Sequence, residues 1–257
     1  MKLAACYTAF NACELLKPSI KQIYNYVDVI IISYQDVSNT GNPILRKDAD
    51  YIKELMNDDK IVFLKFNPDL KTNPKVNERA KLQQRIDKAK QLNCTHYFGA
   101  ATDHFYKPHE FIYAKNKCLE LDVDVTLTKM FTYYKEPTYQ LKPIEDYLCP
   151  FICKIYPSTK VVSDNNYEVR VDPSVRISPA ESFYIFEQYE IMLHHHSMVR
   201  DNIRSKFENA AASQNWKHKI EGFIEEHKNA RVGDSISYFK NRKIVEVPNY
   251  FKIQIKK

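Results

Sequence analysis

Residues 2–34 read KLAACYTAFNACELLKPSIKQIYNYVDVIIISY. The run 2–7 is β-prone, and residues 14–26 carry apolar side chains at the spacing of one helix face. Residues 27–34 are nearly continuous in β-branched residues, as is typical of a strand buried on both faces. This order predicts a strand, a helix and a second strand that together form a β-α-β unit.

The alternation of strand and helix continues to about residue 121. Such alternation predicts a mostly parallel sheet with helices on both faces. The later segments are strand-like and separated by proline-containing turns, which predicts a meander that completes the sheet. The fold class we expect is therefore α/β, with a mixed, mainly parallel central sheet flanked by helices. The expected helices span residues 48–57, 78–92 and 109–121, and the expected strands span 60–66, 95–99, 123–134, 151–156, 159–162, 167–171 and 183–193.

The C-terminal quarter is expected to be helical and to end in a strand. Ser197 is a suitable N-cap for a helix that continues to Ala212, and residues 217–228 predict a further helix. Residues 244–255 predict a final strand. We expect a main domain over residues 1–212 and a C-terminal extension over residues 213–257 that packs on the same domain.

The composition limits the classes of function. The chain contains 257 residues, of which 44% are hydrophobic and 27% charged, as in an ordinary globular protein, and no apolar run approaches the ~18 residues that a membrane span requires. The cysteines are scattered, and the spacing of Cys149 and Cys153 differs from that of a zinc pair, so free thiols and a cytoplasmic location are expected. The net charge of +6 comes from basic residues that alternate with acidic ones, which favours a local anion site over a nucleic-acid-binding face.

Glycine is scarce, with only 4 residues in the chain. Phosphate-binding loops that use backbone N–H groups need several glycines close together, so a Walker loop and a dinucleotide fingerprint are both absent. If the protein binds phosphates, a metal ion and Lys or Arg side chains have to neutralise them.

Polar side chains follow the predicted parallel strands, where ligands bind in open α/β sheets. An alternative for Asn11 and Glu14 is that they only cap the following helix and interact with its dipole. The residues at these strand ends are Tyr7, Thr8, Asn11, Glu14, Gln35, Asp36, Asp103 and His104.

Asp103 is the strongest candidate metal ligand, because it ends a predicted buried strand and stands next to His104. One carboxylate binds a metal weakly, so we expect a further ligand from the run His194, His195 and His196. In an extended chain His194 and His196 share one side and His195 points to the other, so we expect a single ligand from this run and prefer His195. The alternatives are a turn-forming aspartate and histidines that merely end a strand.

Basic residues follow the histidines at Arg200, Arg204 and Lys206. A basic residue in the first turn of a helix opposes the helix dipole, so Arg200 is placed unfavourably for stability alone. This conflict predicts an anionic ligand near Arg200, although a solvated helix face is an equal alternative.

Segments of the sequence resemble the family 2 glycosyltransferases of bacteria and large viruses, which have the GT-A fold. Residues 3–11 and 27–33 look like the start of these enzymes, and residues 95–106, THYFGAATDHFY, are similar to the Asp-x-Asp-Glu-Phe-Tyr segment that holds their metal and nucleotide diphosphate. Residues 194–200, HHHSMVR, resemble a later His-Ser-x-Val-Arg segment. The first aspartate of Asp-x-Asp is Ala101 here, which leaves metal dependence open.

The resemblance implies a hexosyltransferase of GT-A-like fold that moves a sugar from a UDP-sugar or GDP-sugar to a hydroxyl of a glycan or another acceptor. It implies that Thr8 and Asp36 contact the nucleoside and that Lys81 and Arg85 contact the base or the diphosphate. The expected cofactor is Mn²⁺ or Mg²⁺. An inverting reaction also needs an acidic base near the acceptor. The full set is Tyr7, Thr8, Asn11, Asp36, Lys81, Arg85, Arg200 and Lys206 for the nucleotide, Asp103, His104 and His195 for the metal, and Asp103, Glu145, Asp146 and Glu181 for catalysis.

Other interpretations stay open at this point. A nucleotidyltransferase on a related sheet is disfavoured because such enzymes are glycine-rich near their first strand, and the first glycine here is Gly41. Ala101 suggests a weak or inactive GT-A relative that acts as a binding module. The 18 tyrosines and the net charge of +6 leave a basic nucleic-acid-binding protein as a further alternative.

Overall fold

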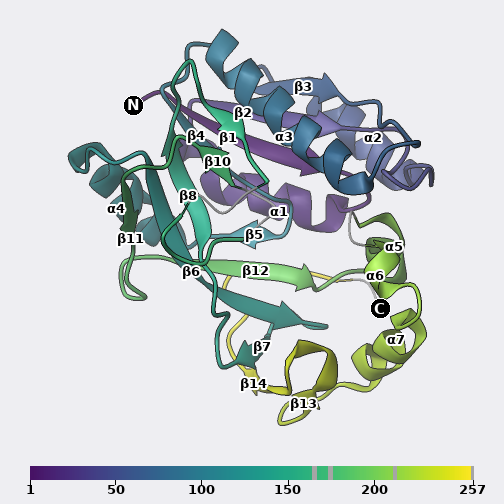
Figure 1. Ribbon diagram of the computed structural model, residues 1–257. Coiled ribbons are helices and arrows are strands. Elements are labelled where there is room, and N and C mark those ends of the chain that lie inside the picture. The colour runs from purple at the N-terminus through teal and green to yellow at the C-terminus, as the bar shows by residue number, and fades with distance from the viewer. Residues whose placement is uncertain (164–166, 173–175, 211–212, 256–257) are drawn as a thin grey trace.

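The computed structural model describes residues 1–163, 167–172, 176–210 and 213–255, and the first half folds as the sequence predicts (Figure 1). Four strands lie side by side in the order β3-β2-β1-β4, and their neighbouring pairs are all parallel. These strands are β1 (Leu3–Ala9), β2 (Val29–Tyr34), β3 (Ile61–Lys65) and β4 (His96–Gly99). The accompanying helices are α1 (Cys13–Ile23), α2 (Arg46–Leu55), α3 (Pro74–Gln91) and α4 (Pro108–Glu120), with a short 3₁₀ turn η1 (Tyr24–Tyr26) after α1.

Side chains of β1 alternate between two apolar clusters, one on each face of the sheet. Leu3, Ala5 and Tyr7 belong to the cluster that also contains apolar residues of α1, α2 and α4. Ala4 and Cys6 belong to the cluster that contains Leu82, Ile86 and Ala89 of α3. Because successive strand residues point to opposite faces, an unbroken apolar strand needs helices on both sides. This explains why the sequence of β1 contains no polar residue before Thr8.

The second half adds strands around β6 (Val125–Tyr134), and the finished sheet is mixed. β6 pairs in parallel with β11 and β12 and antiparallel with β7 and β8, and β8 pairs antiparallel with β4. The predicted α/β class with a mixed central sheet flanked by helices is therefore confirmed. The remaining strands are β5 (His104–Phe105), β7 (Tyr139–Lys142), β8 (Cys149–Lys154), β9 (Lys160–Val161), β10 (Ile177–Ser178), β11 (Phe183–Ile185), β12 (Met192–Met198), β13 (Ser235–Ile236) and β14 (Arg242–Glu246).

The prediction that a helix begins after Ser197 is wrong. β12 runs to Met198, which pairs with Tyr134 of β6, so the three histidines lie inside a strand and not after one. The helix α5 (Ile203–Asn209) begins later, and the side chain of its N-cap Asn202 accepts a hydrogen bond from the backbone N–H of Ser205 at 3.0 Å. Arg200 therefore lies in the connection between β12 and α5 and not in the first turn of a helix.

The C-terminal residues pack on the main sheet. β14 pairs antiparallel with β7, and residues of α7 (Ile220–Asn229) share an apolar cluster with Tyr134 of β6 and Phe207 of α5. The same region contains α6 (Ser213–Trp216) and the 3₁₀ turn η2 (Ser237–Phe239). The domain boundary expected at residue 212 and the end of the helix expected there lie outside the described residues. The predicted strand at residues 167–171 is only an isolated bridge between Leu148 and Val171.

Two further expectations concern cysteines and membranes. All six cysteines are free thiols, and only Cys13 is not fully buried. Within the described ranges, no helix combines the length and the apolar character needed to cross a bilayer.

Candidate functional site

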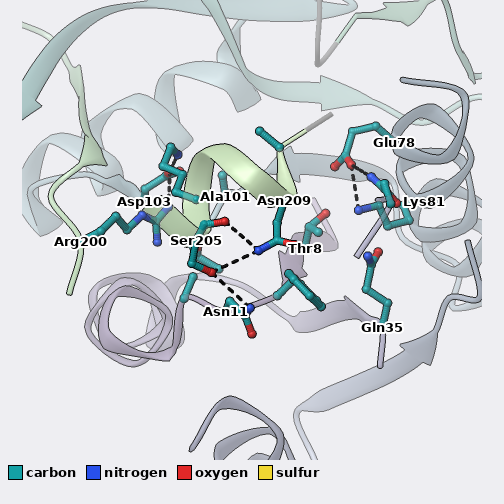
Figure 2. Close-up of a pocket in the computed structure, with 16 residues that line it drawn as sticks. Thr8, Asn11, Gln35, Glu78, Lys81, Ala101, Asp103, Arg200, Ser205 and Asn209 are labelled. Carbon is teal, nitrogen blue, oxygen red and sulfur yellow. Dashed lines mark hydrogen bonds and ion pairs between the residues drawn. The ribbon is translucent and has the colours of Figure 1, made fainter. Parts of the chain in front are cut away.

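A pocket of about 240 Å³ lies at the carboxyl ends of the parallel strands (Figure 2). Its walls come from the residues after β1, β2 and β4, from the start of α3, and from the segment 200–210. This is the edge of the sheet where α/β proteins bind ligands, because the chain leaves the strands there. The predicted site residues that line it are Thr8, Asn11, Lys81, Asp103, Arg200 and Lys206.

One end of the pocket is a cluster of buried charges around Asp103. The Nη2 of Arg200 donates to Oδ2 of Asp103 at 2.7 Å, and the Nζ of Lys206 lies 3.3 Å from the same oxygen. The side chains of Arg200 and Asp103 are only 6% and 9% exposed. Nη1 of Arg200 is buried and has no hydrogen-bond partner among the described residues. One carboxylate thus faces two cations, and a donor of one cation is left unused.

Burial and charge together set the pKa values of this cluster. Burial by itself would raise the pKa of Asp103, but the neighbouring charges of Lys206 and Arg200 hold it well below its usual range. Burial lowers the pKa of Lys206 to about 8, and the attraction of Asp103 limits that decrease. Two cations therefore face the carboxylate of Asp103 at neutral pH, an arrangement that favours an anionic ligand.

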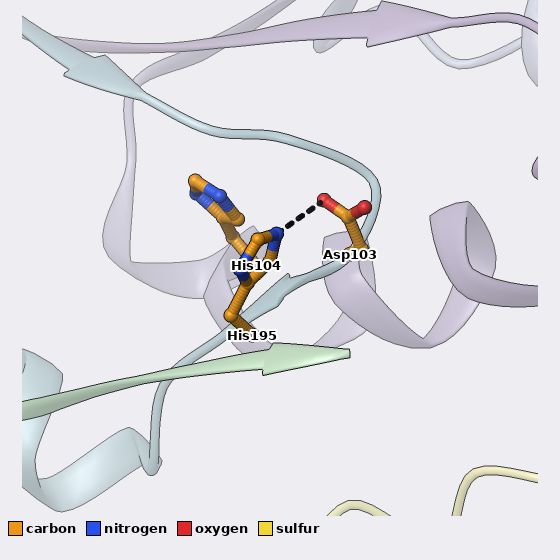
Figure 3. Close-up of side chains that lie close together, drawn as sticks. All are labelled: Asp103, His104 and His195. Carbon is orange, nitrogen blue, oxygen red and sulfur yellow. Dashed lines mark ion pairs between the residues drawn. The ribbon is translucent and has the colours of Figure 1, made fainter. Parts of the chain in front are cut away.

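The other oxygen of Asp103 faces His195, and the ring of His104 lies beside the ring of His195 (Figure 3). Oδ1 of Asp103 lies 3.8 Å from Nε2 of His195, and the donor atoms of Asp103, His104 and His195 all lie within 4.8 Å of one another. Burial lowers the pKa of His195 to about 3 and also lowers the pKa of His104, so both rings are neutral and able to bind a metal. The Nδ1 of His104 is buried without a partner in the described part of the chain.

This donor set fits a divalent metal. Two imidazoles and a carboxylate are a candidate donor set for a divalent transition metal, whereas Mg²⁺ demands oxygen ligands in octahedral geometry. The preference for His195 over its neighbours follows from the strand geometry. His194 and His196 point to the opposite side, where the ring of His196 stacks on Tyr133 at a centroid distance of 4.1 Å.

The opposite end of the pocket is polar and partly anionic (Figure 2). Oε2 of Glu78 accepts from Nζ of Lys81 at 2.8 Å and from Nδ2 of Asn39 at 2.8 Å. Gln35 follows β2 and lines the same end. Sequence reasoning did not select Asn39 or Glu78. Glu78 carried a local signal, because it stands three residues before Lys81 on one helix face.

The middle of the pocket is closed by contacts between α5 and the residues after β1. Nδ2 of Asn209 donates to the carbonyl oxygen of Ser205 at 2.7 Å and to its hydroxyl at 3.1 Å. Nδ2 of Asn11 lies 3.5 Å from that hydroxyl, and Oδ1 of Asn11 accepts from the backbone N–H of Leu45 at 2.8 Å. Asn11 does not cap α1, whose N-cap residue is Ala12. Asn11 thus connects walls of the pocket that are distant in sequence.

Tyr7, Asp36 and Arg85 do not line the pocket. Tyr7 points into the core, where its hydroxyl lies 3.1 Å from the hydroxyl of Ser19. Asp36 turns outward and pairs with Lys65 at 2.7 Å. Arg85 is buried beneath the pocket and donates to the carbonyl oxygen of Cys6 at 3.1 Å. Successive residues of a strand point to opposite faces, so Tyr7 points into the core while its neighbour Thr8 lines the pocket.

The acidic residues expected to act as base lie elsewhere. Glu145 accepts from Thr132 at 3.0 Å and from Nη2 of Arg242 at 2.7 Å. Asp146 is half exposed and pairs with Arg170. The backbone N–H of Glu181 donates to Asp124 at 2.9 Å, and neither residue lines the pocket. The structure therefore does not bring Glu145, Asp146 or Glu181 to the pocket.

No protein-family model and no curated protein sequence matches the chain. Among solved structures, it is similar to S. aureus TarS 1–349, with 12% identity and a TM-score of 0.46 over 82% of this chain and 66% of that chain. The complex of TarS 1–349 with UDP has 13% identity and a TM-score of 0.47 over 90% of this chain and 72% of that chain. A mannose-1-phosphate geranyltransferase from Thermus thermophilus has 12% identity and a TM-score of 0.34 over 61% of this chain and 51% of that chain.

The match covers 66% of TarS 1–349 in one structure, 72% of it in the complex with UDP, and 44% of the longer TarS chain.

Proposed function

We propose that this protein is a glycosyltransferase that moves a sugar from a nucleoside-diphosphate sugar to a hydroxyl group of a glycan or another acceptor. The observation that carries the proposal is the division of the pocket into two ends. One end holds the buried cation Arg200 and the partly buried cation Lys206, and the other holds hydrogen-bonding side chains such as Gln35 and Glu78. A nucleoside diphosphate has the same division, with an anionic end and a polar base.

The cationic end suits the departure of a diphosphate. Negative charge develops on the leaving group during transfer, so cations that are already in place stabilise the transition state more than the ground state. Nη1 of Arg200 makes no hydrogen bond among the described residues, and its N–H bonds are able to donate to a phosphate oxygen. Asp103 is then a positioning residue for Arg200, because it holds Nη2 at 2.7 Å.

A metal ion is part of the proposal. Asp103, His104 and His195 would hold Mn²⁺ through the donor set described above. When bound, the ion would supply additional positive charge to the leaving diphosphate. Arg200 and Lys206 bind the anion through their own charges, so loss of the metal weakens nucleotide binding without abolishing it.

A second candidate function is nucleotide-sugar binding without transfer. Of the described residues that line the pocket, only Asp103 and Glu78 are acidic, and both are held in ion pairs. A general base for an acceptor hydroxyl therefore has to come from outside this lining or with the acceptor. Ala101 also lines the pocket where the family pattern has an aspartate.

Calorimetry with the purified protein tests the proposal. UDP and GDP are titrated with and without Mn²⁺, and the corresponding nucleosides are the control that lacks the anionic end. We expect at least one diphosphate to bind, and to bind at least tenfold more tightly than its nucleoside. No diphosphate binding, together with DNA or RNA binding that falls steeply with salt, would support the nucleic-acid alternative instead.

Product analysis then separates the two candidate functions. The protein that binds a nucleoside diphosphate is incubated with the matching nucleotide sugars, a mixture of glycans and Mn²⁺. Release of the diphosphate together with a glycosylated product supports transfer. Tight binding with no release of the diphosphate supports a binding module.

A further inference from the structure

A second cluster of possible metal ligands lies where helices α1 and α2 begin. The donor atoms of Cys13, Glu14 and Asp48 all lie within 4.8 Å of one another. Cys13 and Glu14 are the first two residues of α1, and Asp48 lies in the first turn of α2. None of the three belongs to the cluster of Asp103 and the two histidines. The fold thus brings a thiol and two carboxylates together at a place that the proposed function does not use.

Asp48 has a structural role that explains only one of its two oxygens. The N-cap residue of α1, Ala12, makes no side-chain cap, and Oδ1 of Asp48 instead accepts from the backbone N–H of Cys13 at 2.7 Å. Asp48 is 2% exposed, yet its Oδ2 is buried without a hydrogen-bond partner among the described residues. Oε2 of Glu14 is buried and unpaired in the same part of the chain. Capping of α1 therefore leaves two acceptor oxygens unexplained.

The carboxylates of this cluster also have no ion pair of their own within the described ranges. The nearby cations already have partners, since Lys47 pairs with Asp201 at 3.1 Å and Arg200 pairs with Asp103 at 2.7 Å. Burial raises the pKa of Glu14, although the charges of Arg200 and Lys47 oppose that change. An unpaired carboxylate is costly to bury, so a cation held between the two carboxylates would stabilise the fold.

A small cavity gives an ion room beside the cluster. Its volume is about 10 Å³, and Cys13 and Asp48 line it together with apolar residues such as Leu16 and Ile52. This volume is close to the least that a single water molecule needs, and a bare divalent ion is smaller than water. Cys13 is not fully buried, so the cluster is open to solvent on its side. Residues 10–12 line both this cavity and the larger pocket, so the cluster adjoins a wall of that pocket.

The donor types indicate which ion fits. A thiolate favours soft or borderline metals, and Zn²⁺ accepts both sulfur ligands at about 2.3 Å and carboxylate oxygens at about 2.0 to 2.2 Å. Ligands at these bond lengths stand about 3 to 4 Å apart, so a spread within 4.8 Å needs only small movements of the side chains. Burial, and then the charge of Asp48, raise the pKa of the Cys13 thiol to about 12. The thiol therefore keeps its proton until a metal ion displaces it.

We propose that Cys13, Glu14 and Asp48 bind Zn²⁺, with water as the fourth ligand. The ion joins the starts of α1 and α2 and steadies residues 10–12 in the wall of the pocket. An ion that binds only the folded chain stabilises it by mass action. This site is separate from the one proposed at Asp103 and does not depend on nucleotide binding.

The test uses Co²⁺ as a spectroscopic probe in the whole protein. A bond between Co²⁺ and a thiolate gives a charge-transfer absorption in the near ultraviolet that nitrogen and oxygen ligands do not give. The cluster at Asp103 contains no sulfur, so this band reports a cysteine ligand. We expect the band to saturate at one thiolate-bound Co²⁺ per chain and to disappear when Zn²⁺ is added. Cys13→Ala should abolish the band, and the matched control Cys94→Ala, which removes a free thiol outside the cluster, should keep it.

Further variants test the two carboxylates. Glu14→Gln and Asp48→Asn should each weaken Co²⁺ binding, measured by the same band, by about tenfold or more, because an amide keeps the shape but loses the charge that attracts the ion. His195→Ala should leave the band and its Co²⁺ affinity unchanged, since His195 belongs to the other cluster.

The outcomes separate this inference from the proposed function. Absence of the band in the parent protein at excess Co²⁺, or its survival in Cys13→Ala, would overturn the inference. Equal Co²⁺ affinity in Glu14→Gln and the parent protein would also overturn it, because the thiol would then bind the ion without the carboxylates. If Cys13→Ala fails to fold, the parent titration and Glu14→Gln decide the matter. Failure of every nucleoside diphosphate to bind would refute the proposed function and leave this site standing.

Discussion

Replacement of Arg200 by Met would remove a buried charge and keep most of the side-chain volume. Arg200 and Asp103 are 6% and 9% exposed and lie 2.7 Å apart. Breaking a buried ion pair lowers the free energy of unfolding by about 3 to 5 kcal/mol. Because Lys206 still neutralises Asp103 in the variant, we expect the low end of this range, about 3 kcal/mol. For a chain of this size, each kcal/mol lost from the free energy of unfolding lowers the melting temperature by about 2 to 4 °C, so we expect the melting temperature to fall by about 6 to 12 °C.

The same variant should weaken nucleotide binding. A hydrogen bond to a charged group contributes about 1.5 to 3 kcal/mol, so loss of the guanidinium should raise the Kd for the preferred diphosphate by roughly 10- to 150-fold. Thermal unfolding measures the first effect and calorimetry the second. Arg204→Met is the matched control, because Arg204 is 43% exposed and pairs with Glu221 away from the pocket, so little change is expected in either assay. Unchanged affinity in Arg200→Met, with only the melting temperature lowered, would show that Arg200 is structural and that the anionic end is misplaced.

Lys206 predicts that binding depends on pH. Its pKa of about 8 means that the amine loses its charge as the pH rises past that value, so the affinity for a diphosphate without metal should fall between about pH 7 and 9. Lys206→Arg should remove this decline, because arginine stays charged. A flat profile in the parent protein would argue against contact between Lys206 and the ligand. Glu145→Gln should lower the free energy of unfolding by about 3 kcal/mol, because it breaks a buried ion pair. The side chains of Glu145 and Arg242 in this pair are 10% and 6% exposed. The same variant should leave nucleotide affinity unchanged. Loss of transfer in that variant at unchanged affinity would restore Glu145 as a catalytic candidate. Ala101→Asp should make nucleotide binding more dependent on Mn²⁺, since a second carboxylate attracts the ion and repels a diphosphate that has no metal bound. Equal affinities with and without Mn²⁺, measured by calorimetry, would contradict this prediction.

Much of the first half of the fold was predictable because its signals are local. Apolar residues at helical spacing, β-branched runs and proline turns depend on neighbours a few residues away. The scarcity of glycine also predicted that side-chain cations, and not a backbone loop, would meet an anion. The structure places Arg200 and Lys206 in the pocket, as expected, although the helix-start argument for Arg200 was wrong.

That error has a physical cause. Residues 194–198 were assigned to a strand end and a helix start on local grounds, but they pair with β6, which lies far earlier in the chain. Pairing with a distant strand satisfies their backbone groups and overrides the weak local preference for a helix. The period of two along that strand was still correct, and it separated His195 from His194 and His196.

The sequence by itself determined the alternating strands and helices of the first half, and it singled out Asp103, Arg200 and Lys206, which line one pocket. Only the tertiary structure decided which side chains meet there. Asp103 pairs with a residue 97 positions later, and Asn39 with one 39 positions later. Glu145 lies outside the pocket lining and accepts a hydrogen bond from Arg242, 97 positions later. Contacts over such separations depend on how the sheet brings distant loops together, and no local pattern encodes that arrangement.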